Sequence, residues 1–138
     1  MSHLIDTNVL SELWKLQSEP AVIAFLDSVE WFVPVSVSAE IQEGAEAAPS
    51  DKKKIDINAR LDVFLRDHSK TMMDFDTEDA RVWGRLKHSQ EVKRQPQALW
   101  DSLIDAMAVR RQFIVITRNQ KDFRHAATVN PWDLIQLP

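Results

Sequence analysis

The chain has 138 residues, of which 44% are hydrophobic and 28% charged, and its formal net charge is −4. These values are typical of one soluble globular domain, so we expect a single domain over residues 1–138. Cysteine is absent and glycine occurs only at Gly44 and Gly84, which excludes disulfides, thiolate metal sites, cysteine nucleophiles and glycine-rich phosphate loops.

Short strands and helices alternate along the predicted chain. Strands are expected at residues 3–6, 31–35, 71–75 and 113–117, and helices at 8–15, from Pro20 onward, and at 38–47, 55–68, 77–93 and 99–111. Proline suits the first position of a helix, and Thr7 or Asn8 can cap the helix over 8–15. Residues 48–54 combine turn formers with like charges and are predicted to be a surface connection.

The last predicted strand indicates the fold class. Residues 113–117 form a continuous apolar run, which is typical of a strand buried on both faces of a parallel sheet. Helices that connect parallel strands make right-handed crossovers and cover the faces of the sheet. We therefore predict an α/β fold, a three-layer α/β/α sandwich with a short parallel sheet.

Acidic side chains follow the predicted strands at one edge of this sheet. Asp6 comes directly after the first strand, and Asp122 follows the strand over 113–117. Ligands of open parallel sheets bind beyond the carboxyl ends of the strands, so these two segments converge on one crevice. Glu40 lies early in the helix after the second strand, and Asp101 lies in the first turns of the helix that precedes the last strand. Both can reach the same edge.

Two interpretations of these acids remain open. Carboxylates gathered without cationic partners raise one another's pKa, and a hard divalent cation such as Mg²⁺ or Mn²⁺ relieves the repulsion. Alternatively, a chain with 21 acidic residues places some of them at strand ends by chance, as solvated surface groups. The four histidines show no i, i+4 metal pair. A serine–histidine–acid triad is compatible with the composition, but the chain has no Gly-x-Ser-x-Gly elbow.

Four segments follow one another at compatible spacing along essentially the whole chain. They are 4–12 (LIDTNVLSE), 38–41 (SAEI) with Gly44, 101–108 (DSLIDAMA), and 117–123 (TRNQKDF) followed by Asn130-Pro131-Trp132. Any one of them is a weak signal, but the ordered set is specific. Together they resemble the PIN-domain ribonuclease toxins of the VapC/FitB type.

The resemblance implies a function as well as a PIN-like fold. It implies an endoribonuclease that depends on Mg²⁺ or Mn²⁺, acts as the toxin of a type II toxin–antitoxin pair, and has a cognate antitoxin. It places metal-binding acids at Asp6 and Asp101, with Glu40 completing the catalytic set. A metal-activated water would then cleave RNA phosphodiester bonds.

The fourth acid departs from the family pattern. Asn119 stands where some members carry an acid, Asp122 follows three residues later, and Asp105 stands where the family usually has alanine. We predict Asp122 as the fourth catalytic acid, and Asn119 and Thr7 as hydrogen-bonding supports of the site. Asp105 is interpreted as a local structural acid, with contact to a second cation as the alternative.

Charge is unevenly distributed along the chain. Residues 1–80 hold 7 Lys/Arg and 16 Asp/Glu, whereas residues 81–138 hold 10 and 5. Basic side chains around an acidic centre can hold RNA phosphates, and Arg85, Arg118 and Lys121 are the candidates. The alternative for each of them is a solvated helix face or strand end.

The predicted partners are RNA, an antitoxin, and a second copy in a homodimer or larger toxin–antitoxin assembly. Leu10, Leu13 and Trp14 form an apolar cluster that indicates a groove for an antitoxin helix or a dimer contact. No apolar run reaches about 18 residues and no leader is recognisable, so we expect no membrane span and a cytoplasmic location. A catalytically inactive PIN-like scaffold, or another metal phosphohydrolase, are the alternatives.

Overall fold

Five parallel strands form the central sheet, in the order β3-β2-β1-β4-β5. The computed structural model describes residues 1–134, without the side chains of Gln90 and Glu91. The strands are β1 (Ser2–Ile5), β2 (Glu30–Pro34), β3 (Met72–Met73), β4 (Ile114–Ile116) and β5 (Thr128–Val129). In the centre of the sheet, Leu4 pairs with Phe32 on one side and Val115 on the other. The predicted parallel α/β architecture is confirmed; the expected domain range of 1–138 extends four residues beyond the described part.

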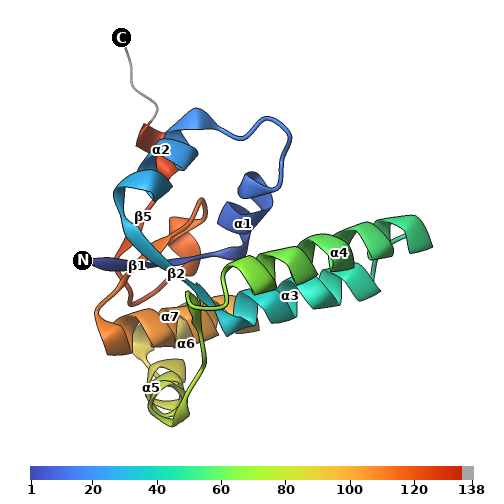
Figure 1. Ribbon diagram of the computed structural model, residues 1–138. Coiled ribbons are helices and arrows are strands. Elements are labelled where there is room, and N and C mark those ends of the chain that lie inside the picture. Colours follow the sequence, from blue (N-terminus) through green and yellow to red (C-terminus); the bar gives the residue numbers. More distant parts are fainter. Residues whose placement is uncertain (135–138) are drawn as a thin grey trace.

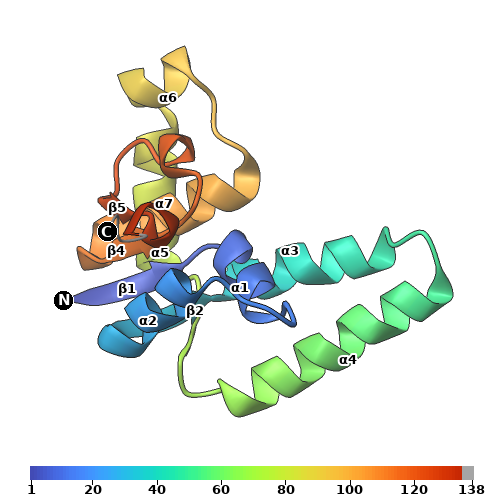
Figure 2. The ribbon, with the colours of Figure 1, turned by 90° about the horizontal axis from the view of Figure 1, so that it is seen from above.

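Helices cover both faces of this sheet (Figure 1). The helices α1 (Thr7–Leu13) and α2 (Pro20–Ser28) lie on one face, and α3 (Val35–Glu46), α5 (Thr77–Lys87) and α7 (Leu99–Arg111) lie on the other. Figure 2 shows that α3 and α4 (Asp51–Asp67) form an antiparallel hairpin that projects from the sheet. The short helix α6 (Gln90–Arg94) follows α5, and two 3₁₀ turns, η1 (Gln120–Asp122) and η2 (Pro131–Leu134), lie near the end of the described chain.

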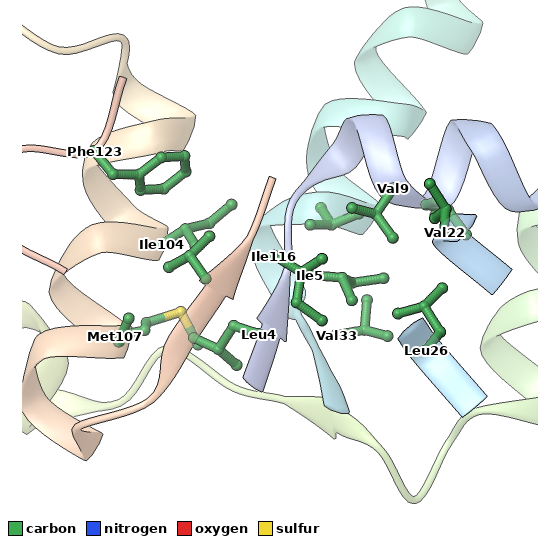
Figure 3. Packing of buried hydrophobic residues seen from close by; sticks show 14 of the residues in the cluster. Leu4, Ile5, Val9, Val22, Leu26, Val33, Ile104, Met107, Ile116 and Phe123 are labelled. Atoms are coloured by element: carbon green, nitrogen blue, oxygen red, sulfur yellow. The ribbon is translucent and has the colours of Figure 1, made fainter. Parts of the chain in front are cut away.

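The core lies on both sides of β1 and β4. Figure 3 shows Ile104, Met107 and Phe123 on one side of these strands, and Val22 and Leu26 on the other. Successive strand residues point to opposite faces, which is why the apolar runs of the central strands are buried without interruption. This packing fixes the positions of the strand ends, where the acidic residues lie.

The structure differs from the predicted elements in several places. The helix expected over 77–93 ends at Lys87, and α6 is separate because the Ser89 Oγ accepts the Val92 N–H at 3.3 Å and starts a new helix. Part of the predicted connection over 48–54 is helical, since the Ser50 hydroxyl accepts the Lys53 N–H at 3.2 Å and caps α4. The two-residue strand β5 was not predicted.

No helix in the described part of the chain is long and apolar enough to cross a membrane.

Candidate active site

Asp6 is a buried carboxylate at the carboxyl end of β1, held by three hydrogen bonds. Its Oδ1 accepts the Thr7 backbone N–H at 2.7 Å, and its Oδ2 accepts the Thr117 hydroxyl at 2.7 Å and the Asn8 amide at 3.1 Å. Asp6 therefore caps α1 itself, and the expected cap at Thr7 or Asn8 is wrong. Burial raises the pKa of Asp6, and the negative charge of Asp122 raises it further. The three hydrogen bonds act in the opposite direction because they stabilise the ionised carboxylate.

The side chains of Asn8 and Thr117 both support Asp6. The sequence had indicated only a helix cap at Asn8 and the end of a strand at Thr117. The Asn8 amide also lies 3.4 Å from the Thr117 hydroxyl, and its Oδ1 accepts the Arg118 N–H at 3.2 Å. The two side chains thereby join the ends of the neighbouring strands β1 and β4 around Asp6. The available signal was polar residues at the carboxyl ends of two predicted parallel strands.

Glu40 reaches the site from the second turn of α3. The Thr7 hydroxyl donates a hydrogen bond of 2.5 Å to Glu40 Oε1, so Thr7 supports Glu40 with its side chain and Asp6 with its backbone. Burial raises the pKa of the half-buried Glu40 carboxyl, and the negative charge of Asp6 raises it further.

Asp101 lies in the first turn of α7, and its carboxyl is the most strongly perturbed of the four acids. Partial burial together with the charges of Asp6, Asp122 and Glu40 raises its pKa to about 7, and only the nearby Arg124 opposes this. The structure thus brings Asp6, Glu40 and Asp122 within electrostatic reach of Asp101. This group is called the acidic cluster below.

The residues that compete for the fourth acidic position differ in location. Asp122 is half-buried in η1 and raises the pKa of both Asp6 and Asp101. Asn119 is exposed, and its backbone N–H, rather than its side chain, supports the site by donating to the Thr117 hydroxyl at 3.0 Å. Asp105 is buried in a separate network and makes none of the described contacts with the acidic cluster.

The donor set of the acidic cluster suits a hard divalent cation. Four carboxylates with the nearby Arg124 guanidinium leave a net negative charge, and this charge adds to burial in raising the pKa of Asp101. Among the side chains that the structure describes, no three His, Asp or Glu residues are grouped closely enough to hold a metal ion as they stand. The Asp6 carboxylate accepts one hydrogen bond at Oδ1, from the Thr7 backbone, and two at Oδ2, from Asn8 and Thr117, which leaves a lone pair of Oδ1 for an ion.

Comparison with known proteins identifies the family. Residues 3–129 match the sequence model of the PIN domain. The chain belongs to the PIN domain family. This PIN domain is 30% identical to the VapC ribonuclease Y4jK of Sinorhizobium fredii, over 94% of this chain and 97% of the relative. It is 29% identical to the toxin FitB of Neisseria gonorrhoeae, with the same coverage of the two chains.

Solved structures agree with this membership and confirm the resemblance seen in the sequence. The PIN domain superimposes on a chain of FitAcB from Neisseria gonorrhoeae with a TM-score of 0.77 and 28% identity, covering 94% of this chain and 98% of that one. A chain of FitAB bound to an IR36 DNA fragment gives a TM-score of 0.76 and 27% identity, with 99% and 97% covered.

The three basic candidates occupy different places in this PIN domain. Arg118 is exposed beside Asn8, and its guanidinium lies 5.1 Å from the centre of the Trp132 ring. Lys121 is exposed in η1, next to Asp122. Arg85 lines a depression on α5 with Arg110, which is more than two turns along α7 from Asp101. Arg118 and Lys121 therefore lie on the segment between β4 and Asp122, and Arg85 does not.

The predicted apolar groove exists in part. Leu10 is fully buried in the core and cannot line a surface. Leu13 and Trp14 line a groove of about 690 Å³ between the end of α1 and α4, which we call the α1–α4 groove. Its other apolar or aromatic walls include Trp31, Val63, Phe64 and His68.

Proposed function

We propose that this PIN domain is a divalent-metal-dependent endoribonuclease and the toxin of a type II toxin–antitoxin pair. The observation that carries the proposal is the acidic cluster, in which partial burial together with three neighbouring carboxylates raises the pKa of Asp101 to about 7. Repulsion among carboxylates destabilises the folded protein unless a bound cation neutralises them, and strongly shifted pKa values are typical of functional sites. The relatives named VapC ribonuclease and toxin FitB support the same activity and biological role.

Each acidic side chain has a role that follows from its position. The chemistry that Mg²⁺ or Mn²⁺ supplies at such a site is polarisation of a phosphodiester oxygen and a lower pKa for a nearby water. Asp6 and Asp101 would hold the cation, with Asp122 as the fourth acid. Glu40, which is fixed by the Thr7 hydroxyl and has a raised pKa, is placed to orient the attacking water and accept its proton. Arg118 and Lys121 would contact the RNA backbone.

Incubation of the purified protein with structured and unstructured RNA tests this proposal. We expect internal cleavage with Mg²⁺ or Mn²⁺ and none after chelation, because the negative cluster repels the phosphodiester unless it is neutralised. Uncleaved RNA across several RNA classes, with the metal bound, would instead favour an inactive scaffold.

We expect Mn²⁺ affinity to depend on pH. Since the metal-free Asp101 has a pKa of about 7, a proton competes with the cation below that pH. Affinity should therefore rise as the pH increases from about 6 to about 8, and the dependence should be weaker in Asp101→Asn. Calorimetric titration at each pH measures this. Equal affinities across the range would contradict the assignment of Asp101 as a ligand.

We also propose an antitoxin that covers the acidic cluster and the α1–α4 groove. The chains solved in FitAcB and FitAB structures support a partner protein for this fold. An Arg or Lys of the antitoxin would neutralise the carboxylates in place of metal. An amphipathic helix would bury Trp14 and the exposed Val63 of the groove. A homodimer or larger assembly of such pairs is part of the same proposal.

Expression of the chain alone should arrest growth, and co-expression with the protein encoded immediately upstream should restore it. Val63→Lys places a charge in the α1–α4 groove and should weaken that rescue because the ammonium must be desolvated on binding. Ile55→Lys is the matched control, since Ile55 is exposed on α4 and does not line the groove. Equal rescue of both variants would exclude the groove as the antitoxin site.

A further inference from the structure

Asp105 is almost completely buried, and its carboxylate faces the segment that carries Asp122. Its Oδ1 accepts the backbone N–H groups of Ala126 at 2.8 Å and His125 at 3.4 Å. Its Oδ2 lies 3.0 Å from His125 Nδ1 and accepts the Gln97 amide at 3.2 Å. Asp105 is only 1% exposed, so its carboxylate contacts these four polar groups in place of water. It is therefore a structural acid, as predicted, but its contacts all lead to two segments near the acidic cluster.

Gln97 extends this network to the backbone of Asp122. Its Nε2 donates to Asp105 Oδ2 and also, at 3.0 Å, to the carbonyl oxygen of Asp122. The Gln97 amide thus links the Asp105 carboxylate to Asp122, the residue whose side-chain charge acts on Asp6 and Asp101. Between Asp122 and His125, the buried Phe123 adds an apolar anchor in the core.

The same network places an acid, an imidazole and a hydroxyl in a row, which raises the question of a serine nucleophile. His125 Nε2 lies 2.9 Å from Ser89 Oγ, and His125 Nδ1 faces Asp105. However, Ser89 Oγ also accepts the Val92 N–H at the start of α6, which is the geometry of a helix cap. The row therefore connects the start of α6 to α7 through His125.

We propose that Asp105 and Gln97 are positioning residues that hold Asp122 beside Asp6 and Asp101 and thereby set the affinity of the acidic cluster for a divalent cation. The inference rests on the proposed function, because it assigns Asp122 to the metal-binding set. Supporting hydrogen bonds of this kind orient the ligating groups, and their removal commonly costs about 10- to 100-fold in metal affinity.

Gln97→Ala tests the proposal with little risk to folding, since Gln97 is only partly buried. Gln95→Ala is the matched control, because Gln95 is exposed and the Arg124 guanidinium contacts only its backbone carbonyl. Hydrogen exchange of the amides over 119–126 reports whether the segment is held, and calorimetry with Mn²⁺ reports the consequence for the cluster. We expect faster exchange and about tenfold weaker Mn²⁺ binding in Gln97→Ala, and neither change in Gln95→Ala.

A double-mutant cycle with Asp122→Asn separates positioning from a general loss of structure. If Gln97 acts through Asp122, adding Gln97→Ala to Asp122→Asn causes no further loss of Mn²⁺ affinity. Additive losses, or unchanged exchange in Gln97→Ala, overturn the inference. Asp105→Asn keeps an oxygen for the two backbone N–H groups and should weaken Mn²⁺ binding less than Asp105→Ala.

The parent protein distinguishes this inference from the proposed function. If the parent binds Mn²⁺ but does not cleave RNA, the proposed ribonuclease activity is refuted. The double-mutant cycle then still decides whether Gln97 positions Asp122. A parent that cleaves RNA while the cycle is additive refutes positioning alone. A parent without Mn²⁺ binding overturns both.

Discussion

Replacement of Asp101 by Asn is expected to reduce metal-dependent RNA cleavage by on the order of 10³-fold, and Asp6→Asn should have a similar effect. Asparagine keeps the size of the side chain but removes the charge that attracts the cation. Metal activation of phosphodiester hydrolysis contributes several kcal/mol to transition-state stabilisation, and about 1.4 kcal/mol corresponds to a factor of ten in rate. Single-turnover cleavage at saturating enzyme measures the chemical step. Asp27→Asn, on the exposed part of α2, is the control and should be as active as the parent.

The same Asp101 variant should be more stable than the parent when metal is absent. The pKa of Asp101 is about 7 in the folded protein against 3.8 in the unfolded chain, so between these values the folded state binds more protons. Stability from this group is therefore present below pH 3.8 and is lost as the pH rises to about 7. Since the side chain is half-buried and partly screened by solvent, we expect Asp101→Asn to gain about 1 kcal/mol at pH 8. Loss of activity combined with lower stability would indicate damage to the fold instead.

Much of the fold could be predicted because its signals are local. Pro20 marks the start of α2, and the apolar run before Thr117 marks a central strand. The sheet edge then follows from topology, since parallel strands connected by helices bring their carboxyl ends together. This is why Asp6 and Asp122, more than a hundred residues apart, could be assigned to one crevice.

The supports of the site could not be assigned from the same signals. Thr117 and Asn8 join two strand ends, and their hydrogen bonds depend on the register of β1 with β4. Gln97 and Asp105 meet Asp122 and His125 only in the folded chain. Spacing along α7 showed that Asp105 lies one turn from Asp101, but not which segment it faces. The structure was therefore needed to assign side-chain contacts between segments, whereas the edge of the sheet could be predicted from the sequence.

Arg111→Met is expected to lower the free energy of unfolding by about 3–5 kcal/mol. Arg111 reaches from the end of α7 to α5, where its guanidinium donates two hydrogen bonds, of 2.6 and 3.0 Å, to the carboxylate of Asp79. Asp79 is fully buried and also completes the capping box of α5 by accepting the Asp76 N–H at 2.9 Å. Methionine fills similar volume but removes both of these hydrogen bonds and leaves the carboxylate with the longer contact of 3.7 Å to Arg110, and a poorly compensated buried charge is strongly destabilising.

The neighbouring Arg110 provides the matched control for this prediction. Arg110 contacts the exposed acids Asp76 at 3.0 Å and Glu78 at 3.1 Å, and it reaches the buried Asp79 only at 3.7 Å, without the two short hydrogen bonds of Arg111. Arg110→Met should therefore cost much less than Arg111→Met, about 1 kcal/mol. Urea unfolding of both variants gives the comparison, and adding Asp79→Leu to Arg111→Met should recover part of the loss because the orphaned charge is removed. Equal destabilisation by the two arginine variants would show that burial of Asp79 does not govern the strength of this contact. Since the pair lies at the far end of α7 from Asp101, Mn²⁺ affinity of the folded Arg111→Met protein should match that of the parent.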